Sequence, residues 1–117
     1  MSDVVVRRVY DEPDPQAGAR ILVDRLWPRG LSKERAALDE WCKAVAPSPE
    51  LRTWYGHDQT RYAEFTERYR DELRSGEQQE ALQRLRQRAR TEPLVLLTAT
   101  TDPQISSAAI LAVLLRD

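Results

Sequence analysis

The chain has 117 residues, of which 41% are hydrophobic and 32% are charged, a composition typical of a globular protein with a charged exterior. At this length we expect one domain over residues 1–117. Basic residues number 18 and acidic residues 19, so the net charge gives no support for nucleic-acid binding, which normally needs a clustered basic footprint. The single cysteine excludes an intramolecular disulfide and any multi-cysteine metal site.

Three features favour a cytoplasmic protein with no membrane association. The first residues lack the basic and apolar pattern of a signal peptide. The most apolar run, residues 108–115, is too short to span a bilayer. A lone thiol, Cys42, suits a reducing compartment.

The first third of the chain predicts two strands. Val4-Val5-Val6 followed by Val9-Tyr10 is β-branched and aromatic enough for a strand. The two prolines within residues 11–15 predict a loop. Arg20 to Asp24 is predicted as a second strand, and its continuous apolar centre indicates burial on both faces.

A helix is expected next, with Ser32 as its N-cap. Leu38, Trp41, Cys42 and Val45 follow helical spacing and predict a core-facing stripe. On that stripe Cys42 is interpreted as a small buried residue rather than a nucleophile. The prolines that follow should end the helix.

The middle of the chain predicts three further helices. Ser48-Pro49 is a start signal for a short helix that ends at Gly56. Asp58 or Thr60 can cap the next helix, which should end at Gly76 and whose apolar stripe is Tyr62, Phe65, Tyr69 and Leu73. The third helix has a narrower stripe, formed by Leu82, Leu85 and Ala89.

The last segment predicts a strand and a helix. Leu94 to Leu97 is the clearest strand, residues 98–102 form a loop, and Pro103 or Ser106 opens the final helix. Ala108 to Leu115 is apolar nearly all round, so this helix either packs deep against the sheet or is covered by another subunit. The order predicts an α/β layered fold, with a short, at least partly parallel sheet of about three strands covered by helices.

Candidate site residues follow the predicted strands and helices. Asp24, Arg25, Trp27 and Arg29 follow the second strand, and Thr98 and Thr100 follow the last one. Ser106 and Ser107 precede the final helix, where free N–H groups favour anions. Arginine suits carboxylate or phosphate, and tryptophan offers a stacking face. The ligand-binding candidates are Arg25, Trp27, Arg29, Thr98, Thr100, Ser106 and Ser107.

His57 and Asp24 are the catalytic candidates, each with a structural alternative. The imidazole of His57 could exchange protons near neutral pH, or it could bond a backbone carbonyl at a helix end. Asp24 could contact a ligand or form a buried pair with Arg25. Arg29 could point into a site or lie at the tip of a turn. The sequence contains no His, Cys and carboxylate residues at metal-ligand spacing, and it does not identify a cofactor.

Several motifs together resemble the YeaO-like family, a domain of unknown function (number 488). The matching motifs cover nearly the whole chain in order and are Val9-Tyr10-Asp11, residues 22–31, Leu38-Asp39 with Trp41, Ala46-Pro47-Ser48, Glu50-Leu51-Arg52 and Tyr55-Gly56-His57. The resemblance implies a small cytoplasmic α/β protein with no established activity. It carries over Asp24, Arg25, Trp27, Arg29 and His57 as matching positions.

One position departs from the family pattern. Relatives usually carry Asn-His or Asn-Asn where this chain has Ser106-Ser107. Hydroxyls still form hydrogen bonds but cannot replace an imidazole in proton transfer. If the family site is catalytic, this chain is altered in it.

Three functions are open. The leading hypothesis is a pocket for an anionic small molecule, such as a nucleotide or sugar phosphate, with or without catalysis. The alternative is a non-catalytic binding or regulatory module, possible as a homodimer through the last helix. The third and least favoured is a nucleic-acid binder through Arg84, Arg86, Arg88 and Arg90, which alternate with other residues and so point to different helix faces.

Overall fold

The computed structural model describes residues 3–14 and 16–116, so Pro15 of the expected loop lies outside the described residues. Its strands are β1 (Val4–Arg8), β2 (Ala19–Leu22), β3 (Glu40–Trp41) and β4 (Leu94–Thr98). Its α-helices are α1 (Lys33–Ala36), α2 (Pro49–Tyr55), α3 (Tyr62–Glu72), α4 (Gly76–Ala89) and α5 (Ser107–Arg116). Short 3-10 turns span Lys43–Val45, Gln59–Arg61 and Pro103–Ile105. Within the described residues, no helix has the length and apolar character needed to cross a membrane.

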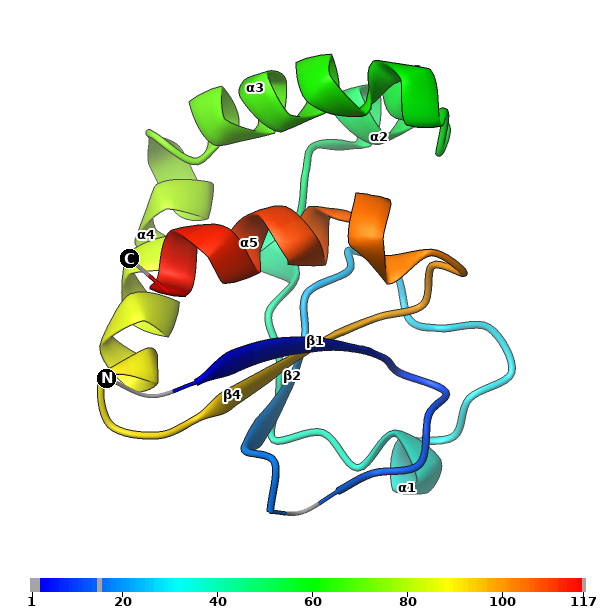
Figure 1. Ribbon diagram of the computed structural model, residues 1–117, viewed down its shortest axis with the longest axis vertical. Coiled ribbons are helices and arrows are strands. Elements are labelled where there is room, and N and C mark those ends of the chain that lie inside the picture. The colour runs from blue at the N-terminus through cyan, green and yellow to red at the C-terminus, as the bar shows by residue number, and fades with distance from the viewer. Residues whose placement is uncertain (1–2, 15, 117) are drawn as a thin grey trace.

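The strands form one parallel sheet in the order β1-β4-β2-β3. The predicted α/β class is therefore confirmed, with β3 as a strand that the sequence did not indicate. Helices α3, α4 and α5 lie on one side of the sheet, while α1 and long loops lie on the other (Figure 1). The carboxyl ends of the parallel strands point to one edge, where loops of an α/β fold commonly build a site.

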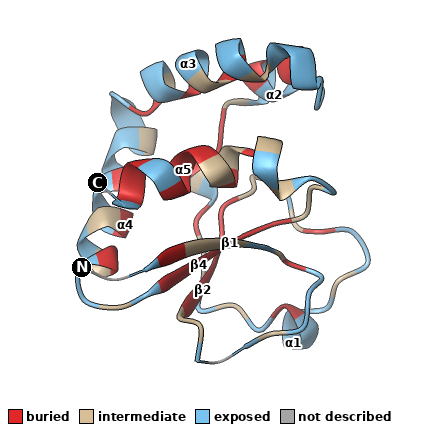
Figure 2. Ribbon diagram, viewed as in Figure 1, coloured by how far each residue is buried: buried red, intermediate tan, exposed pale blue. Residues whose placement is uncertain are grey.

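Successive side chains along a strand point to opposite faces of the sheet, and they pack into two apolar clusters, one on each face. In β4, Leu94 and Leu96 pack toward the helices, whereas Val95 and Leu97 pack toward the loops. β2 is buried along its whole length (Figure 2), which confirms the burial on both faces expected from its apolar centre.

Helix α5 is covered by the chain itself. Its buried residues are Ala108, Ile110, Leu111, Ala112, Leu114 and Leu115, and they join the cluster on the helical side of the sheet (Figure 2). The first of the two expected alternatives, deep packing against the sheet, thus accounts for its apolar sequence. Val113 remains 52% exposed.

The prediction of a helix with a core-facing stripe from Leu38 to Val45 is wrong. Ser32 does cap α1 by accepting a hydrogen bond from the Arg35 amide, but α1 ends at Ala36 and Ala37 turns left-handed with φ 49°. The cause is the buried Arg20, whose guanidinium donates to the carbonyls of Ala36 and Ala37 at 2.8 and 3.1 Å. These bonds satisfy the helix end, and the chain then pairs with β2 as β3.

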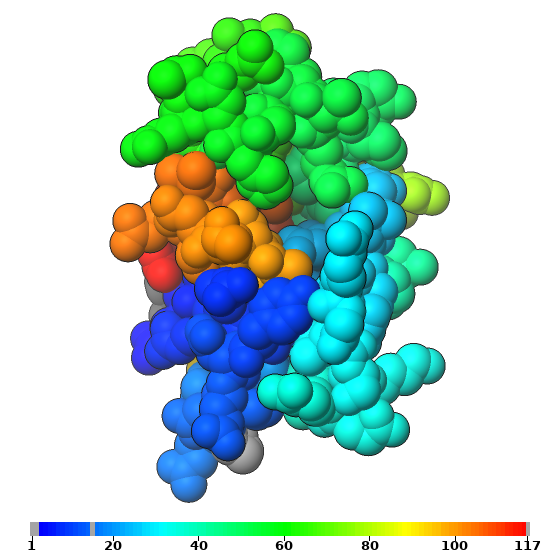
Figure 3. Space-filling view, turned by 90° about the vertical axis from the view of Figure 1, so that its right-hand side faces the viewer, coloured from blue at the N-terminus to red at the C-terminus, as the bar shows by residue number. Residues whose placement is uncertain are grey.

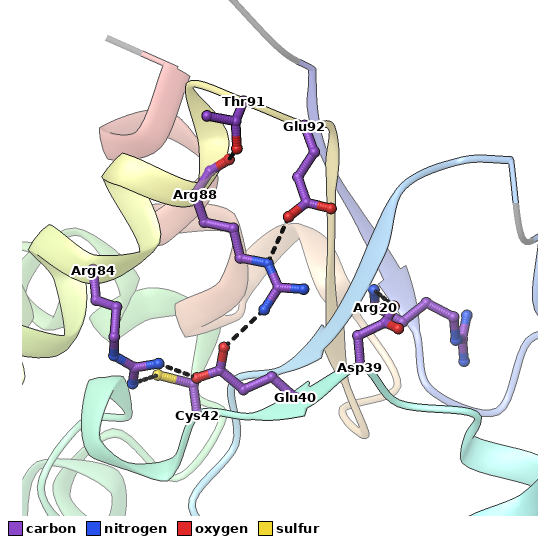
Figure 4. Close-up of polar contacts among 8 residues, drawn as sticks. All are labelled: Arg20, Asp39, Glu40, Cys42, Arg84, Arg88, Thr91 and Glu92. Carbon is purple, nitrogen blue, oxygen red and sulfur yellow. Dashed lines mark hydrogen bonds and ion pairs between the residues drawn. The ribbon is translucent and has the colours of Figure 1, made fainter.

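Polar contacts fasten β3 to α4. Glu40 accepts hydrogen bonds from Arg84 and Arg88, and Arg88 also pairs with Glu92 at 2.9 Å (Figure 4). Cys42 is buried as expected, with its sulfur 3.5 Å from the Arg84 guanidinium. Because Glu40 engages Arg84 and Arg88, the four arginines between residues 84 and 90 do not form an unpaired basic stripe.

Most other helix signals are confirmed, but Asp58 caps the 3-10 turn Gln59–Arg61 and not α3, which begins at Tyr62 without a side-chain cap. Ser48 caps α2, Pro49 is its first residue, and Gly56 ends it in the left-handed region. The stripe from Tyr62 to Leu73 packs in the core. Gly76 was expected to end α3, but α3 already ends at Glu72. Gly76, with φ 68°, is instead the first residue of α4. The left-handed glycine therefore marks the bend between the two helices.

Candidate functional site

Segments that are distant in sequence meet at the carboxyl edge of the sheet. The loops after β1, β2 and β4 border one another and the end of α2 on the face shown in Figure 3. They enclose a cleft of about 490 Å³, within the ~300–1,000 Å³ range of small-molecule sites. The sequence-predicted residues that line it are Asp24, Arg25, Trp27, Arg29, His57, Thr98, Thr100, Ser106 and Ser107.

Asp24 joins the ends of β2 and β4. One carboxylate oxygen accepts a hydrogen bond from the Thr98 hydroxyl at 2.9 Å, and the other accepts from the Ala99 amide at 2.8 Å. Burial raises the pKa of the Asp24 carboxyl, and these two hydrogen bonds oppose that rise. The carboxylate is thus held by the protein at the floor of the cleft.

Of the two alternatives for Asp24, the buried pair with Arg25 is absent among the described residues. The Arg25 guanidinium donates instead to the carbonyls of Pro47 and Ala46, at 3.2 and 3.3 Å. These bonds tie the loop after β2 to the segment before α2 and hold a positive charge at the cleft.

Trp27 and Arg29 differ in how tightly they are held. The Trp27 indole donates to the Leu31 carbonyl at 2.7 Å and packs edge-on against Trp41, with ring centroids 5.3 Å apart. Arg29 is exposed, and its carbonyl accepts a hydrogen bond from the Tyr10 hydroxyl at 2.9 Å. Trp27 therefore stabilises the loop as well as lining the cleft, while the Arg29 side chain has no ion pair among the residues described.

His57 follows the end of α2 in an unusual backbone conformation. Gly56 and His57 both have positive φ, 54° and 56°, a region that costs a non-glycine residue free energy. Its imidazole is exposed at the cleft and makes no hydrogen bond to any group within residues 3–14 and 16–116. The structural alternative, a bond to a carbonyl at the helix end, is therefore absent there.

The start of α5 is anchored against α2 and α3. The Tyr55 hydroxyl donates to the Ile105 carbonyl at 2.7 Å, and the Tyr62 hydroxyl donates to the Ser106 carbonyl at 3.3 Å. Burial raises the pKa of Tyr55 to about 12, so its hydroxyl remains a donor at neutral pH. The Ser106 hydroxyl caps α5 by accepting from the Ala109 amide at 3.3 Å, and Ser107 lies beside it in the cleft wall.

Arg52 is the principal site residue that sequence reasoning missed. It lies on α2, lines the cleft, and is exposed, and its charge lowers the pKa of Asp24. A signal was available, because Glu50-Leu51-Arg52 is one of the motifs of the family resemblance and Arg52 lies one helical turn before Gly56. Tyr10 and Leu26 also line the cleft without having been predicted.

Fold and site together define a small α/β protein with a parallel sheet and an arginine-lined cleft at its carboxyl edge. A family model described as "Inactive DUF488-N3 subclade" matches residues 3–117, and the chain belongs to that family. The YeaO-like resemblance is confirmed by the relatives that follow.

Two uncharacterised relatives cover nearly the whole chain. The chain is 46% identical over 112 residues to "Uncharacterized protein Rv3073c" of Mycobacterium tuberculosis, which covers 96% of this chain and 92% of that protein. It is 43% identical over 114 residues to "Uncharacterized protein YeaO" of Escherichia coli, covering 97% of each. No solved structure matches it significantly.

Proposed function

We propose that the cleft reversibly binds a small anionic molecule and does not transform it. The observation that carries this proposal is the charge of the cleft wall: its described residues include Arg25, Arg29 and Arg52 but one carboxylate, that of Asp24. Because the whole chain has a net charge of −1, this surplus is local. Clustered guanidiniums attract phosphate and carboxylate groups.

The start of α5 supports the same ligand chemistry. Ser107 lies in the cleft wall, and the first N–H groups of a helix carry a partial positive charge that favours anions. The hydroxyls of Thr100 and Ser107 add donors that can turn toward a ligand. Such groups suit a phosphate or carboxylate in a nucleotide- or sugar-phosphate-like molecule.

Binding without turnover is supported by how the candidate catalytic groups are engaged. Both oxygens of Asp24 accept hydrogen bonds from the protein, and the Ser106 hydroxyl serves as a helix cap. The family description contains the word "Inactive", and Ser106-Ser107 replaces the Asn-His or Asn-Asn pair that the resemblance implies. His57 is the one remaining proton-transfer candidate.

Calorimetric titration with inorganic phosphate, ribose 5-phosphate and AMP tests the proposal. Losing one charge-assisted contact to an anion costs about 1.5–3 kcal/mol, so R52A should weaken binding about tenfold to a hundredfold. The matched control is R90A, since Arg90 is exposed at the end of α4 and away from the cleft. Loss of affinity in both variants alike, or no binding by any of the three compounds, would refute the proposal.

A second measurement addresses turnover. Each compound is incubated with the protein and followed by phosphorus and proton NMR. We expect unchanged spectra over many hours, and steady product formation that H57A abolishes would instead establish an enzyme.

A further inference from the structure

Two exposed hydrophobic residues line the cleft, and the positive charge of the cleft wall does not account for them. Within the described part of the chain, three large hydrophobic residues are exposed: Leu26 at 61%, Val113 at 52% and Tyr10 at 37%. Leu26 and Tyr10 both line the cleft, whereas Val113 does not. Exposed apolar side chains grouped at a cavity commonly mark a binding surface.

The Tyr10 ring is held in place before any ligand arrives. Its hydroxyl donates to the Arg29 carbonyl at 2.9 Å, and the Arg8 guanidinium lies 5.3 Å from the ring centre. Arg8 is itself fixed by a hydrogen bond from its Nε to the Thr100 carbonyl at 3.1 Å. These two contacts orient the ring, and an aromatic ring that is already oriented binds a flat partner at lower entropic cost.

The segment after β1 and helix α2 lie on opposite sides of the loop that follows β4 (Figure 3). In Figure 3 the segment after β1 lies below the orange segment that follows β4, and α2 lies above it. Tyr10 belongs to the lower segment, while Arg52 and His57 belong to α2 and the turn after it. A ligand that spans the cleft therefore meets Arg52 and His57 at one end, and at the other the Tyr10 ring, with the Arg8 guanidinium beside it.

Asp24 adds a hydrogen-bond acceptor to the cleft wall, close enough to Arg52 for that charge to lower its pKa. Among the described residues it is the one carboxylate in a wall that contains three arginines, so it repels an anion but can accept hydrogen bonds from hydroxyl groups. A bare anion gains nothing from this residue. A ligand that carries hydroxyl groups next to its anionic group can donate hydrogen bonds to the Asp24 carboxylate.

We infer that the ligand of the proposed binding function is a nucleoside monophosphate, with its phosphate at Arg52, its ribose hydroxyls toward Asp24 and its base against Tyr10 and Leu26. This inference rests on the proposed function and selects among its ligand classes. A cleft of about 490 Å³ is near the lower part of the range for small-molecule sites, which suits one nucleotide rather than two.

Titrations with AMP, ribose 5-phosphate and adenosine separate the contributions of base and phosphate. Stacking of a base on an aromatic side chain supports an affinity gain of about tenfold, so AMP should bind about tenfold more tightly than ribose 5-phosphate. L26A should remove most of that advantage and leave ribose 5-phosphate binding unchanged, and Y10A should likewise lower the affinity for AMP. V113A is the matched control, because Val113 is similarly exposed but outside the cleft.

The outcomes distinguish this inference from the function on which it rests. Equal affinities for AMP and ribose 5-phosphate, unaffected by L26A, would overturn the base assignment while the anion site stands. If no phosphate compound binds, the proposed function fails as well. Concentration-dependent self-association that L26A abolishes would assign Leu26 and Tyr10 to a contact with a second copy of the chain and overturn the inference.

Discussion

Replacing Asp24 tests whether this carboxyl is held at the junction of β2 and β4 at an electrostatic cost. Asp24→Ala leaves the Thr98 hydroxyl and the Ala99 amide without their acceptor. Two hydrogen bonds to a charged group are lost, while water enters the cleft in their place. We therefore expect a loss of about 2–4 kcal/mol in the free energy of unfolding.

Asp24→Asn is the informative companion, because it keeps the shape and removes the charge. The amide oxygen can still accept from Ala99, and its NH₂ group can donate to the Thr98 hydroxyl. Since burial raises the pKa of Asp24 in the folded protein, ionisation favours the unfolded chain. Each unit of that rise costs the wild type about 1.4 kcal/mol at neutral pH, so Asp24→Asn should stay within about 1 kcal/mol of the wild type.

The difference in stability between the wild type and Asp24→Asn should change with pH in a direction set by the Asp24 pKa. A raised folded pKa contributes stability that is present below the unfolded pKa and is lost as pH rises through the folded pKa. Urea unfolding of wild type and Asp24→Asn from about pH 3 to about pH 7 should show the wild type losing stability relative to the variant. Other titrating groups cancel in this difference. A wild type that gains on the variant as pH rises would refute the reasoning.

Further predictions concern backbone conformation and ion pairing. Gly18 has φ 137°, and a Cβ added there would lie 2.4 Å from the Pro93 carbonyl oxygen, so G18A should lower the free energy of unfolding in urea by about 3 kcal/mol. Gly30 has φ 73° and open space around it, so G30A should cost about 1 kcal/mol. Equal losses would contradict the packing argument. H57G should be about 1 kcal/mol more stable than H57A, because glycine accepts the φ of 56° without strain; equal stability of the two variants would count against strain. Glu40 bridges two arginines with its side chain 20% exposed, so E40Q should cost about 1 kcal/mol in low salt and less in 1 M salt (about 3 Å screening length); a cost unaffected by salt would exclude ion pairing as its source.

Local sequence determined the elements whose stabilising contacts are close in the chain. The Ser48-Pro49 start and the Gly56 end of α2 are of this kind, because a cap acts within one helical turn. The β-branched and leucine-rich run of β4 was likewise recognisable, since a strand buried on both faces needs an unbroken apolar sequence.

Elements stabilised by distant partners could not be predicted in this way. Leu38, Trp41 and Val45 have helical spacing, yet the buried guanidinium of Arg20 ends α1 at Ala36. Glu40 and Trp41 then pair with β2 as an edge strand. The spacing was compatible with a helix, and a long-range hydrogen bond decided against it.

The residue types of the candidate site were readable in the sequence, but their individual bonds were not. Residues placed after strands of a parallel sheet gather at one edge for topological reasons, which is why Asp24, Thr98 and Ser106 share a cleft. Which carbonyl receives Arg25, and that Arg52 on α2 faces the same space, depend on packing between segments far apart in the chain. The chain by itself therefore determined the elements with local signals and the chemistry available at the sheet edge, while the tertiary structure decided where α1 ends, that β3 forms, and which charges are held by the protein or free to meet a ligand.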